Sequence, residues 1–208
     1  MLQHTKTTRK GTGIIQMIEH KEHFHGSDLE KIEKIYGISK ENIINFAANV
    51  NPLGESDKLK DALYKRIDAI TQYPDREYTS LRKAIAKYCQ CDYNDVVVGN
   101  GCTELISLFI QVTSPKQTLL IVPTYSEYER DLKLNGSKVC YFNLEENDDF
   151  RINTDNFLKN ITPETDLIII CNPNNPTAGI IFSDELRTIL THCQNTNTYV
   201  MIDETYIE

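Results

Sequence analysis

The chain has 208 residues, 40% hydrophobic and 25% charged, so it can bury a core and fits one large domain, or one domain and part of another. Its formal net charge of −8 and pI near 5.2, with no basic stripe to offset the acids, argue against nucleic acid as a partner. No apolar run is long enough to span a membrane, and the polar start MLQHTKTTRKGTG lacks the features of a secretory signal. We therefore expect a cytoplasmic protein.

The first fifty residues are polar and are expected to form an N-terminal arm. His20, His23 and His25 are spaced like metal ligands, but no carboxylate or thiolate cluster accompanies them, so we predict a solvated segment and no metal. The six cysteines are scattered without CxxC spacing, which favours reduced, mostly buried thiols.

Helical and strand-like segments alternate along the rest of the chain. Residues 57–70 and 80–89 repeat apolar side chains at helical spacing, and both are predicted to be amphipathic helices. Gly136 is expected to end one later helix and Ser183 to cap the start of another. The short apolar runs are 95–101, 118–125, 138–144, 166–173 and 198–206. The helical stretches between them are 103–113, 126–136 and 183–193.

The apolar runs indicate the fold class. They are apolar nearly throughout instead of alternating with polar residues, which is typical of strands with helices on both faces. The sequence therefore predicts an α/β domain of three layers with a mostly parallel sheet.

Ligands of parallel sheets bind at the carboxyl ends of the strands, so the residues that follow each run are informative. Gly99 and Gly101 precede a helix and favour an anion at its N-terminus. A dinucleotide fingerprint is disfavoured because Glu104 stands where a third glycine is needed, and the absence of GKS or GKT excludes a P-loop. The four strand-end motifs are GNGCTE (99–104), PTYSEY (123–128), CNPNNPTAG (171–179) and DETY (203–206).

In this order, the four motifs resemble those of the pyridoxal-phosphate enzymes of fold type I, class I/II aminotransferases. Upstream, NFAANVNPLG (45–54) and QYPDREYTSLRKAIAKY (72–88) are similar to segments of the histidinol-phosphate aminotransferase branch. The resemblance implies an aminotransferase that uses pyridoxal 5'-phosphate and acts on an amino acid or a phosphorylated amino compound. It divides the chain into an arm or small-domain segment, 1–50, and the N-terminal portion of the cofactor-binding large domain, 51–208.

The resemblance also implies roles around the cofactor ring. Asp203 matches the carboxylate that keeps the pyridine nitrogen protonated, which the ring needs to act as an electron sink. Asn175 and Tyr206 match two donors to the phenolate oxygen, and Tyr125 matches the aromatic side chain that stacks on the ring. Each has a simpler alternative: a strand-end cap for Asp203, a proline-braced turn for Asn175 and packing for Tyr125.

Other residues match the positions that hold the cofactor phosphate. Gly101, Cys102 and Thr103 match the cradle, through their backbone N–H groups and the Thr103 hydroxyl. Tyr73 resembles a tyrosine that reaches the phosphate bound by the neighbouring subunit. The resemblance thus implies a homodimer with a shared active site.

Two functional residues of the family have no counterpart in the sequence. Family members bond the cofactor to a lysine downstream of the DETY position, and a later arginine binds the substrate carboxylate. No lysine follows Lys159 and the chain ends at Glu208. We therefore expect a truncated large domain, and an isolated 208-residue chain that is inactive.

The substrate has two interpretations within the family. The HGSD stretch (25–28) together with NVNPLG is similar to threonine-phosphate decarboxylases of cobalamin synthesis, which makes His25, Ser27 and Asn51 candidate substrate contacts. The alternatives to an aminotransferase are therefore this decarboxylase or a non-catalytic protein that binds pyridoxal phosphate. A flexible arm is the structural alternative for His25 and Ser27.

Overall fold

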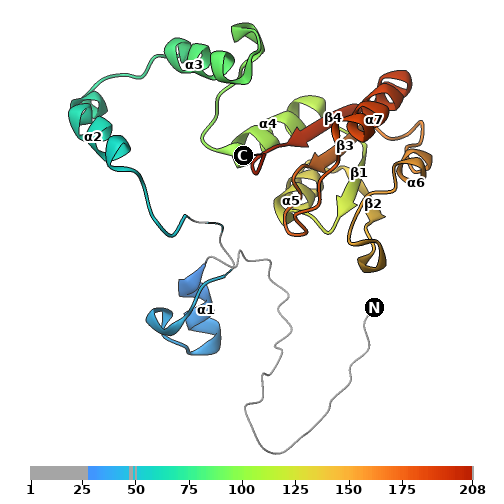
Figure 1. The fold of residues 1–208 in the computed structure, drawn as a ribbon, viewed down its shortest axis with the longest axis horizontal. Helices are drawn as coiled ribbons and strands as arrows, with labels where there is room; N and C mark the ends of the chain where they lie inside the picture. The colour runs from blue at the N-terminus through green and yellow to red at the C-terminus, as the bar shows by residue number, and fades with distance from the viewer. Residues whose placement is uncertain (1–27, 47–48, 50, 208) are drawn as a thin grey trace, which may run out of the picture. The chain divides into compact units, whose positions relative to one another are not determined.

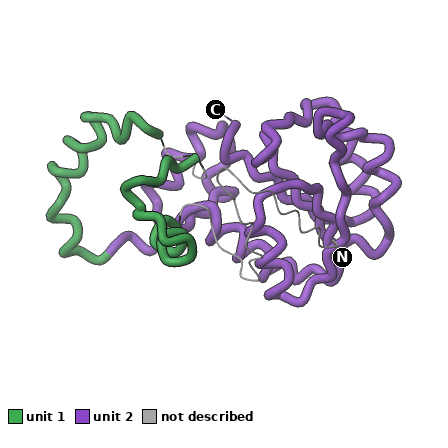
Figure 2. Tube along the Cα trace, turned by 90° about the horizontal axis from the view of Figure 1, so that it is seen from below, with its two compact units in different colours: residues 1–73 green, residues 74–208 purple. Residues whose placement is uncertain are grey.

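The computed structural model describes residues 28–46, 49 and 51–207, and the chain forms two compact units, Met1–Tyr73 and Pro74–Glu208 (Figure 2). In the first unit, the Asp28 carboxylate caps the first helix by accepting the Lys31 N–H at 3.1 Å. The helix predicted over 57–70 breaks at Arg66 into an α-helix and a 3-10 turn. The elements of this unit are α1 (Leu29–Tyr36), η1 (Lys40–Asn42), α2 (Asp57–Lys65) and η2 (Ile67–Thr71).

The second unit begins with a helix and a 3-10 turn, α3 (Thr79–Cys89) and η3 (Tyr93–Asp95), which Arg82 ties together. Its Nε donates to the Val96 carbonyl at 2.8 Å, and its guanidinium lies 4.2 Å from the centre of the Tyr93 ring. This pairing of hydrogen bond and ring contact fixes the segment that leads into the next helix.

Four parallel strands form the sheet of the second unit, in the order β2-β1-β3-β4 (Figure 1). Each consecutive pair of strands is joined through a helix, as parallel pairing requires. The strands are β1 (Gln117–Val122), β2 (Lys138–Asn143), β3 (Leu167–Cys171) and β4 (Tyr199–Asp203). The other elements are α4 (Cys102–Thr113), α5 (Ser126–Leu134), η4 (Glu146–Asp148), α6 (Thr154–Lys159) and α7 (Ser183–Thr196).

The two faces of the sheet pack against different helices, which confirms the predicted three-layer arrangement. On one face, Ile110 of α4 and Leu132 of α5 are fully buried against the strands. On the other face, Phe157 of α6 and Ile189 of α7 are fully buried. Every residue of β3 is buried, because this inner strand is covered on both faces.

Several sequence predictions differ from the structure in detail. The apolar run at 95–101 is not a strand, since no described strand pairs with it and Val97 is 73% exposed. Ser183 is the first residue of α7 and not its cap: the cap is Phe182, whose N–H donates to Glu185 at 2.9 Å. Gly136 does follow the end of α5, with a φ of 76° that favours glycine.

The cysteines are only partly buried. All six are free thiols. Cys171 and Cys193 are buried, whereas Cys89, Cys91 and Cys102 are exposed, so the expectation of mostly buried thiols is wrong. None of the described helices is long and apolar enough to cross a bilayer.

Replacing Ile169 of β3 by alanine should lower the free energy of unfolding by about 3 kcal/mol, because a buried cavity forms between β3 and the α4/α5 layer. Val112→Ala on α4 is the control, since Val112 is 84% exposed and its loss should change stability by less than about 0.5 kcal/mol. Urea unfolding followed by circular dichroism measures both. Equal stability of the two variants would contradict the described core.

Candidate active site

The order of the strands locates the candidate site. From β1 the chain moves to β2 on one side, and β3 then lies on the other side of β1, so the strand order reverses between β1 and β3. In open parallel sheets, ligands bind at the carboxyl ends of the strands beside such a reversal. The strands end there at Val122, Cys171 and Asp203, and Cys171 pairs in register with Asp203.

Asp203 is a buried carboxylate at the end of β4, with 8% of its surface exposed. It lies on the sheet face covered by α4 and α5, because Met201 packs on that face and side chains two residues apart share a face. Its Oδ2 accepts a hydrogen bond from the Tyr128 hydroxyl at 2.6 Å. Its Oδ1 accepts from the Thr205 N–H at 3.0 Å and the Thr205 hydroxyl at 2.6 Å. A carboxylate accepts about four hydrogen bonds, so roughly one position remains for a further donor.

Tyr128 of α5 holds this carboxylate, and the sequence analysis did not identify it. Its side chain is fully buried, and its ring packs edge-to-face against Tyr125 with 5.5 Å between ring centres. Burial, followed by the hydrogen bond to Asp203, raises the pKa of the Tyr128 phenol, so the hydroxyl remains protonated and donates. The signal that could have found it is its place in the sequence: Tyr128 ends the PTYSEY motif, three residues after Tyr125, the N-cap of α5.

The N-terminus of α4 lies beside Asp203. Gly101 caps this helix with a φ of 82°, a conformation that L side chains rarely adopt. The first-turn N–H groups, including those of Cys102 and Thr103, have no partner within the helix. Partial burial raises the pKa of the Cys102 thiol. Neighbouring Thr205 lowers this pKa and Asp203 raises it, so the thiol lies near the end of β4.

The loop after β3 contains three asparagines with different functions. Asn172 exchanges two hydrogen bonds with the backbone of Ile181, at 3.0 and 2.9 Å. Asn174 is also bound, to residues of its own loop and of the loop after β1. Among the described residues, the side-chain amide of Asn175 has no hydrogen-bond partner, so two amides shape the loop and the third is available to a ligand.

The remaining predicted residues are Tyr206, Tyr73, Asn51, His25 and Ser27. Tyr206 follows β4 and is 39% exposed. Tyr73 belongs to the first unit and is almost fully exposed. Asn51 binds its own turn, accepting from the Leu53 N–H at 3.0 Å. His25 and Ser27, together with the histidines at 20 and 23, lie outside the described residues. Across the part of the chain that the structure describes, no three His, Cys, Asp or Glu side chains are grouped to hold a metal.

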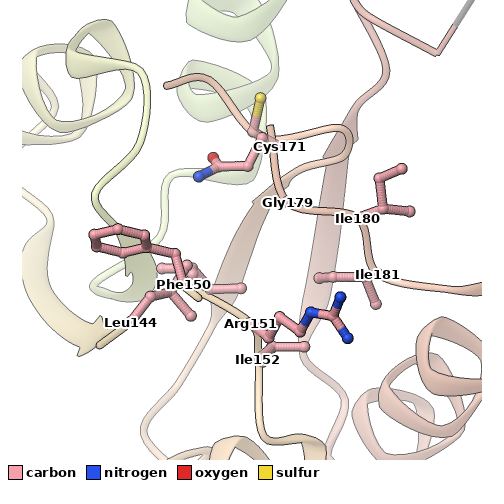
Figure 3. Close-up of a pocket in the computed structure, with 10 residues that line it drawn as sticks. Leu144, Phe150, Arg151, Ile152, Cys171, Gly179, Ile180 and Ile181 are labelled. Atoms are coloured by element: carbon pink, nitrogen blue, oxygen red, sulfur yellow. The ribbon is translucent and has the colours of Figure 1, made fainter. Parts of the chain in front are cut away.

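A separate pocket lies mainly on the opposite face of the sheet, where Ile121 packs with the α6/α7 layer (Figure 3). Its other lining residues are Cys171, the last residue of β3, and residues of the segments after β2 and β3: Leu144, Phe150, Arg151, Ile152, Asn174, Gly179, Ile180 and Ile181. Asp203 does not line this pocket, whereas Cys171, which pairs in register with Asp203, does.

The residues of the cluster fit a flat, anionic, nitrogen-containing ring. Asp203 has one acceptor position left for a protonated nitrogen, and the Asn175 amide can donate to a ring oxygen. Tyr125 supplies an aromatic surface, and the N-terminus of α4 supplies N–H groups for a phosphate. These are the donors and surfaces that pyridoxal phosphate requires.

Comparison with known proteins identifies one family and many relatives. The model of the family aminotransferase class I and II matches residues 41–208. The chain is 33% identical over 184 residues to the threonine-phosphate decarboxylase of Salmonella typhimurium, covering 88% of this chain and 50% of that protein. It is 33% identical over 186 residues to the histidinol-phosphate aminotransferase of Methanocaldococcus jannaschii, covering 88% and 49%.

Solved structures give the same relationship. The histidinol-phosphate aminotransferase from Clostridium acetobutylicum superposes with a TM-score of 0.69 at 32% identity, covering 77% of this chain and 47% of that one. The L-threonine-O-3-phosphate decarboxylase from Porphyromonas gingivalis gives 0.67 at 25% identity, covering 79% and 47%. The chain spans about half the length of the curated relatives it matches.

With Tyr128 replaced by phenylalanine, the protein should lose less stability as the pH rises into the alkaline range. The folded state raises the pKa of this phenol above its ordinary value of 10.0, so only the unfolded chain releases the proton just above that pH. The contribution of Tyr128 to stability is therefore complete below about pH 10 and is lost as the pH rises further. At neutral pH the same variant should lose about 1.5–3 kcal/mol, because Asp203 loses a donor.

Urea unfolding at about pH 8 and about pH 11 measures both effects. Tyr64→Phe is the control, because Tyr64 is 74% exposed, and it should follow the unchanged protein. The same pH dependence in all three proteins would contradict a buried, proton-retaining Tyr128.

Proposed function

Because this chain belongs to the class I and II aminotransferase family, whose members use pyridoxal 5'-phosphate, we propose that the strand-end cluster binds this cofactor and that the complete protein transfers an amino group to or from a small amino compound. The observation that supports this best is the buried Asp203 carboxylate, which Tyr128 holds with an acceptor position remaining. An unpaired amide, an aromatic ring and a helix N-terminus accompany it.

The residues of this chain would divide the work as follows. When bound, the cofactor supplies an electron-withdrawing ring that stabilises negative charge on the substrate. Asp203 holds the proton on the ring nitrogen, and Tyr128 fixes the orientation of its carboxylate. Asn175 and Tyr206 donate to the phenolate oxygen, while Tyr125 covers one face of the ring and excludes water.

The phosphate is assigned to the first turn of α4. Gly101 and the N–H groups of Cys102 and Thr103 form the cradle, and the helix dipole favours the negative charge there. The Cys102 side chain contributes less than the backbone N–H groups, because a thiol is only a weak hydrogen-bond donor. Covalent attachment of the cofactor needs an amine, and we assign it to none of these 208 residues.

The substrate we propose first is a phosphorylated amino compound of the histidinol-phosphate type. The two relatives reported above, a histidinol-phosphate aminotransferase and a threonine-phosphate decarboxylase, each match at 33% identity, so we keep the decarboxylase as the second candidate. His25, Ser27 and Asn51 are the proposed substrate contacts. Release of carbon dioxide from threonine phosphate distinguishes the decarboxylase, and cofactor binding without any product identifies a non-catalytic protein.

The proposed setting is a cytoplasmic homodimer that does not bind nucleic acid. The net charge of −8 supports the last point. Tyr73 is proposed to reach the phosphate of the neighbouring subunit's cofactor, which makes the active site a shared one.

Replacing Asp203 by asparagine in the complete protein should lower turnover by at least about a hundredfold and weaken cofactor retention, because an amide cannot balance a charged ring nitrogen. Asp155→Asn is the matched control, since Asp155 is an exposed acid on α6 and should leave both properties unchanged. Steady-state kinetics and equilibrium dialysis of pyridoxal phosphate measure the two effects. Near-normal turnover of a folded Asp203→Asn protein would refute the assignment.

Mixing subunits should reveal whether the site is shared. Tyr73→Phe and Asp203→Ala proteins are each expected to be severely impaired, because each lacks one contribution to every site. Heterodimers contain one site with both residues intact and should regain up to about half of the activity per such dimer. Activity after subunit exchange by mild denaturation measures this, with each variant refolded alone as the control. Absence of recovery would show that each site is built within one chain.

A further inference from the structure

Asn174 lies in the loop after β3, beside the place where the strand order reverses between β1 and β3. All of its polar groups are bonded. Its backbone N–H donates to the Gly179 carbonyl at 2.9 Å, and its carbonyl accepts from the Ala178 N–H at 2.8 Å. Its side-chain amide makes three further bonds, which uses the whole hydrogen-bonding capacity of a primary amide's nitrogen.

Two of these three bonds cross to the loop after β1. The turn that contains Asn174 does not need them for its own conformation. The Asn174 Nδ2 donates to the Pro123 carbonyl at 2.9 Å, and the Thr124 hydroxyl donates to its Oδ1 at 3.0 Å. The third bond stays within the loop, from Nδ2 to the Thr177 hydroxyl oxygen at 2.8 Å. A residue that only shaped its own turn would need the Thr177 and backbone bonds alone.

The residues at the two ends of this connection are adjacent to proposed ligand contacts. Thr124 immediately precedes Tyr125, and Asn174 immediately precedes Asn175. We propose that Asn174 is a positioning residue that fixes the Tyr125 ring relative to the Asn175 amide. The inference rests on the proposed function, in which a flat ligand stacks on Tyr125. With the ring and the amide held in this relation, the edge of that ligand faces Asn175.

The chemistry of the connection requires an amide. Aspartate has the same shape and could still accept from Thr124, but it would face the Pro123 carbonyl with a second acceptor. Asn174→Asp therefore weakens the connection between the two loops with a minimal change of side-chain volume. Thr124→Val removes one crossing bond. Thr177→Val removes only bonds within the loop, those from the Asn174 Nδ2 and the Gly179 N–H, which makes Thr177→Val the matched control.

The first experiment needs no cofactor. Amide hydrogen exchange is followed in the complete protein and the three variants, for residues 124–126 and 172–181. Asn174→Asp and Thr124→Val should speed exchange in both segments, although each substitution lies in only one of them. Thr177→Val should affect 172–181 alone. Unchanged exchange at 124–126 in Asn174→Asp would overturn the connection.

The second experiment adds pyridoxal phosphate. Asn174→Asp should bind it about tenfold more weakly and show a reduced circular dichroism of the bound cofactor's visible band, because the ring is held less asymmetrically. Thr177→Val should stay within about twofold of the unchanged protein and keep the band. If Asn174 had a purely structural role, both variants should lose stability alike and the visible band of the bound cofactor should be unchanged. That result would refute the positioning role.

A double variant, Thr124→Val with Asn174→Asp, adds an internal check. If the two residues act through one connection, the combined loss of affinity should be smaller than the product of the single losses. Full multiplication of the losses would contradict the proposal. If the unchanged complete protein binds no pyridoxal phosphate, the proposed function fails and the positioning role fails with it, while the exchange data still decide whether the two loops are connected.

Discussion

Burial of both faces of the parallel sheet is the constraint on which the candidate site depends. Every residue of β3 is buried, so a polar side chain along this strand would need a partner inside the core. Thr118 of β1 is a polar residue that has such a partner: it is fully buried, and its hydroxyl is hydrogen-bonded to that of Ser137 at 2.9 Å. Polar groups meant for a ligand are thereby confined to the strand ends, where helix N-termini also lie.

The sheet could be predicted from sequence because its strands are marked by burial. Unbroken apolar runs indicate strands covered on both faces, and four of the five runs are strands. The run at 95–101 is not a strand because an apolar pattern indicates burial but does not supply a strand to pair with. Val96 is buried, yet the segment pairs with none of the described strands. The short α6 was missed because it lacks a long apolar repeat, and only its Phe157 is buried.

The candidate site was predictable only in part. Asp203, Cys102 and Tyr125 each belong to a strand-end motif, and parallel strands bring such ends to one edge. Tyr128 and Asn174 also stand in strand-end motifs, but the motifs do not reveal what these two side chains contact, because their partners lie 75 and 50 residues away in the sequence. A buried tyrosine looks like ordinary core, and an asparagine between prolines looks like an ordinary turn. Both acquire their function from a contact that only the folded chain supplies.

The paired bonds between Asn172 and the backbone of Ile181 close the loop after β3 at its base. Here a side-chain amide takes the place of a peptide group, giving and receiving one hydrogen bond as two neighbouring strands would. Because the loop is closed at its base, the path of the chain into α7 does not depend on the side chains at the tip of the loop. The exposed side chains of Ala178 and Ile180 can therefore change in size while the helix and the sheet keep their positions. A loop closed in this way can change the side chains that it offers to a ligand without a change in the scaffold.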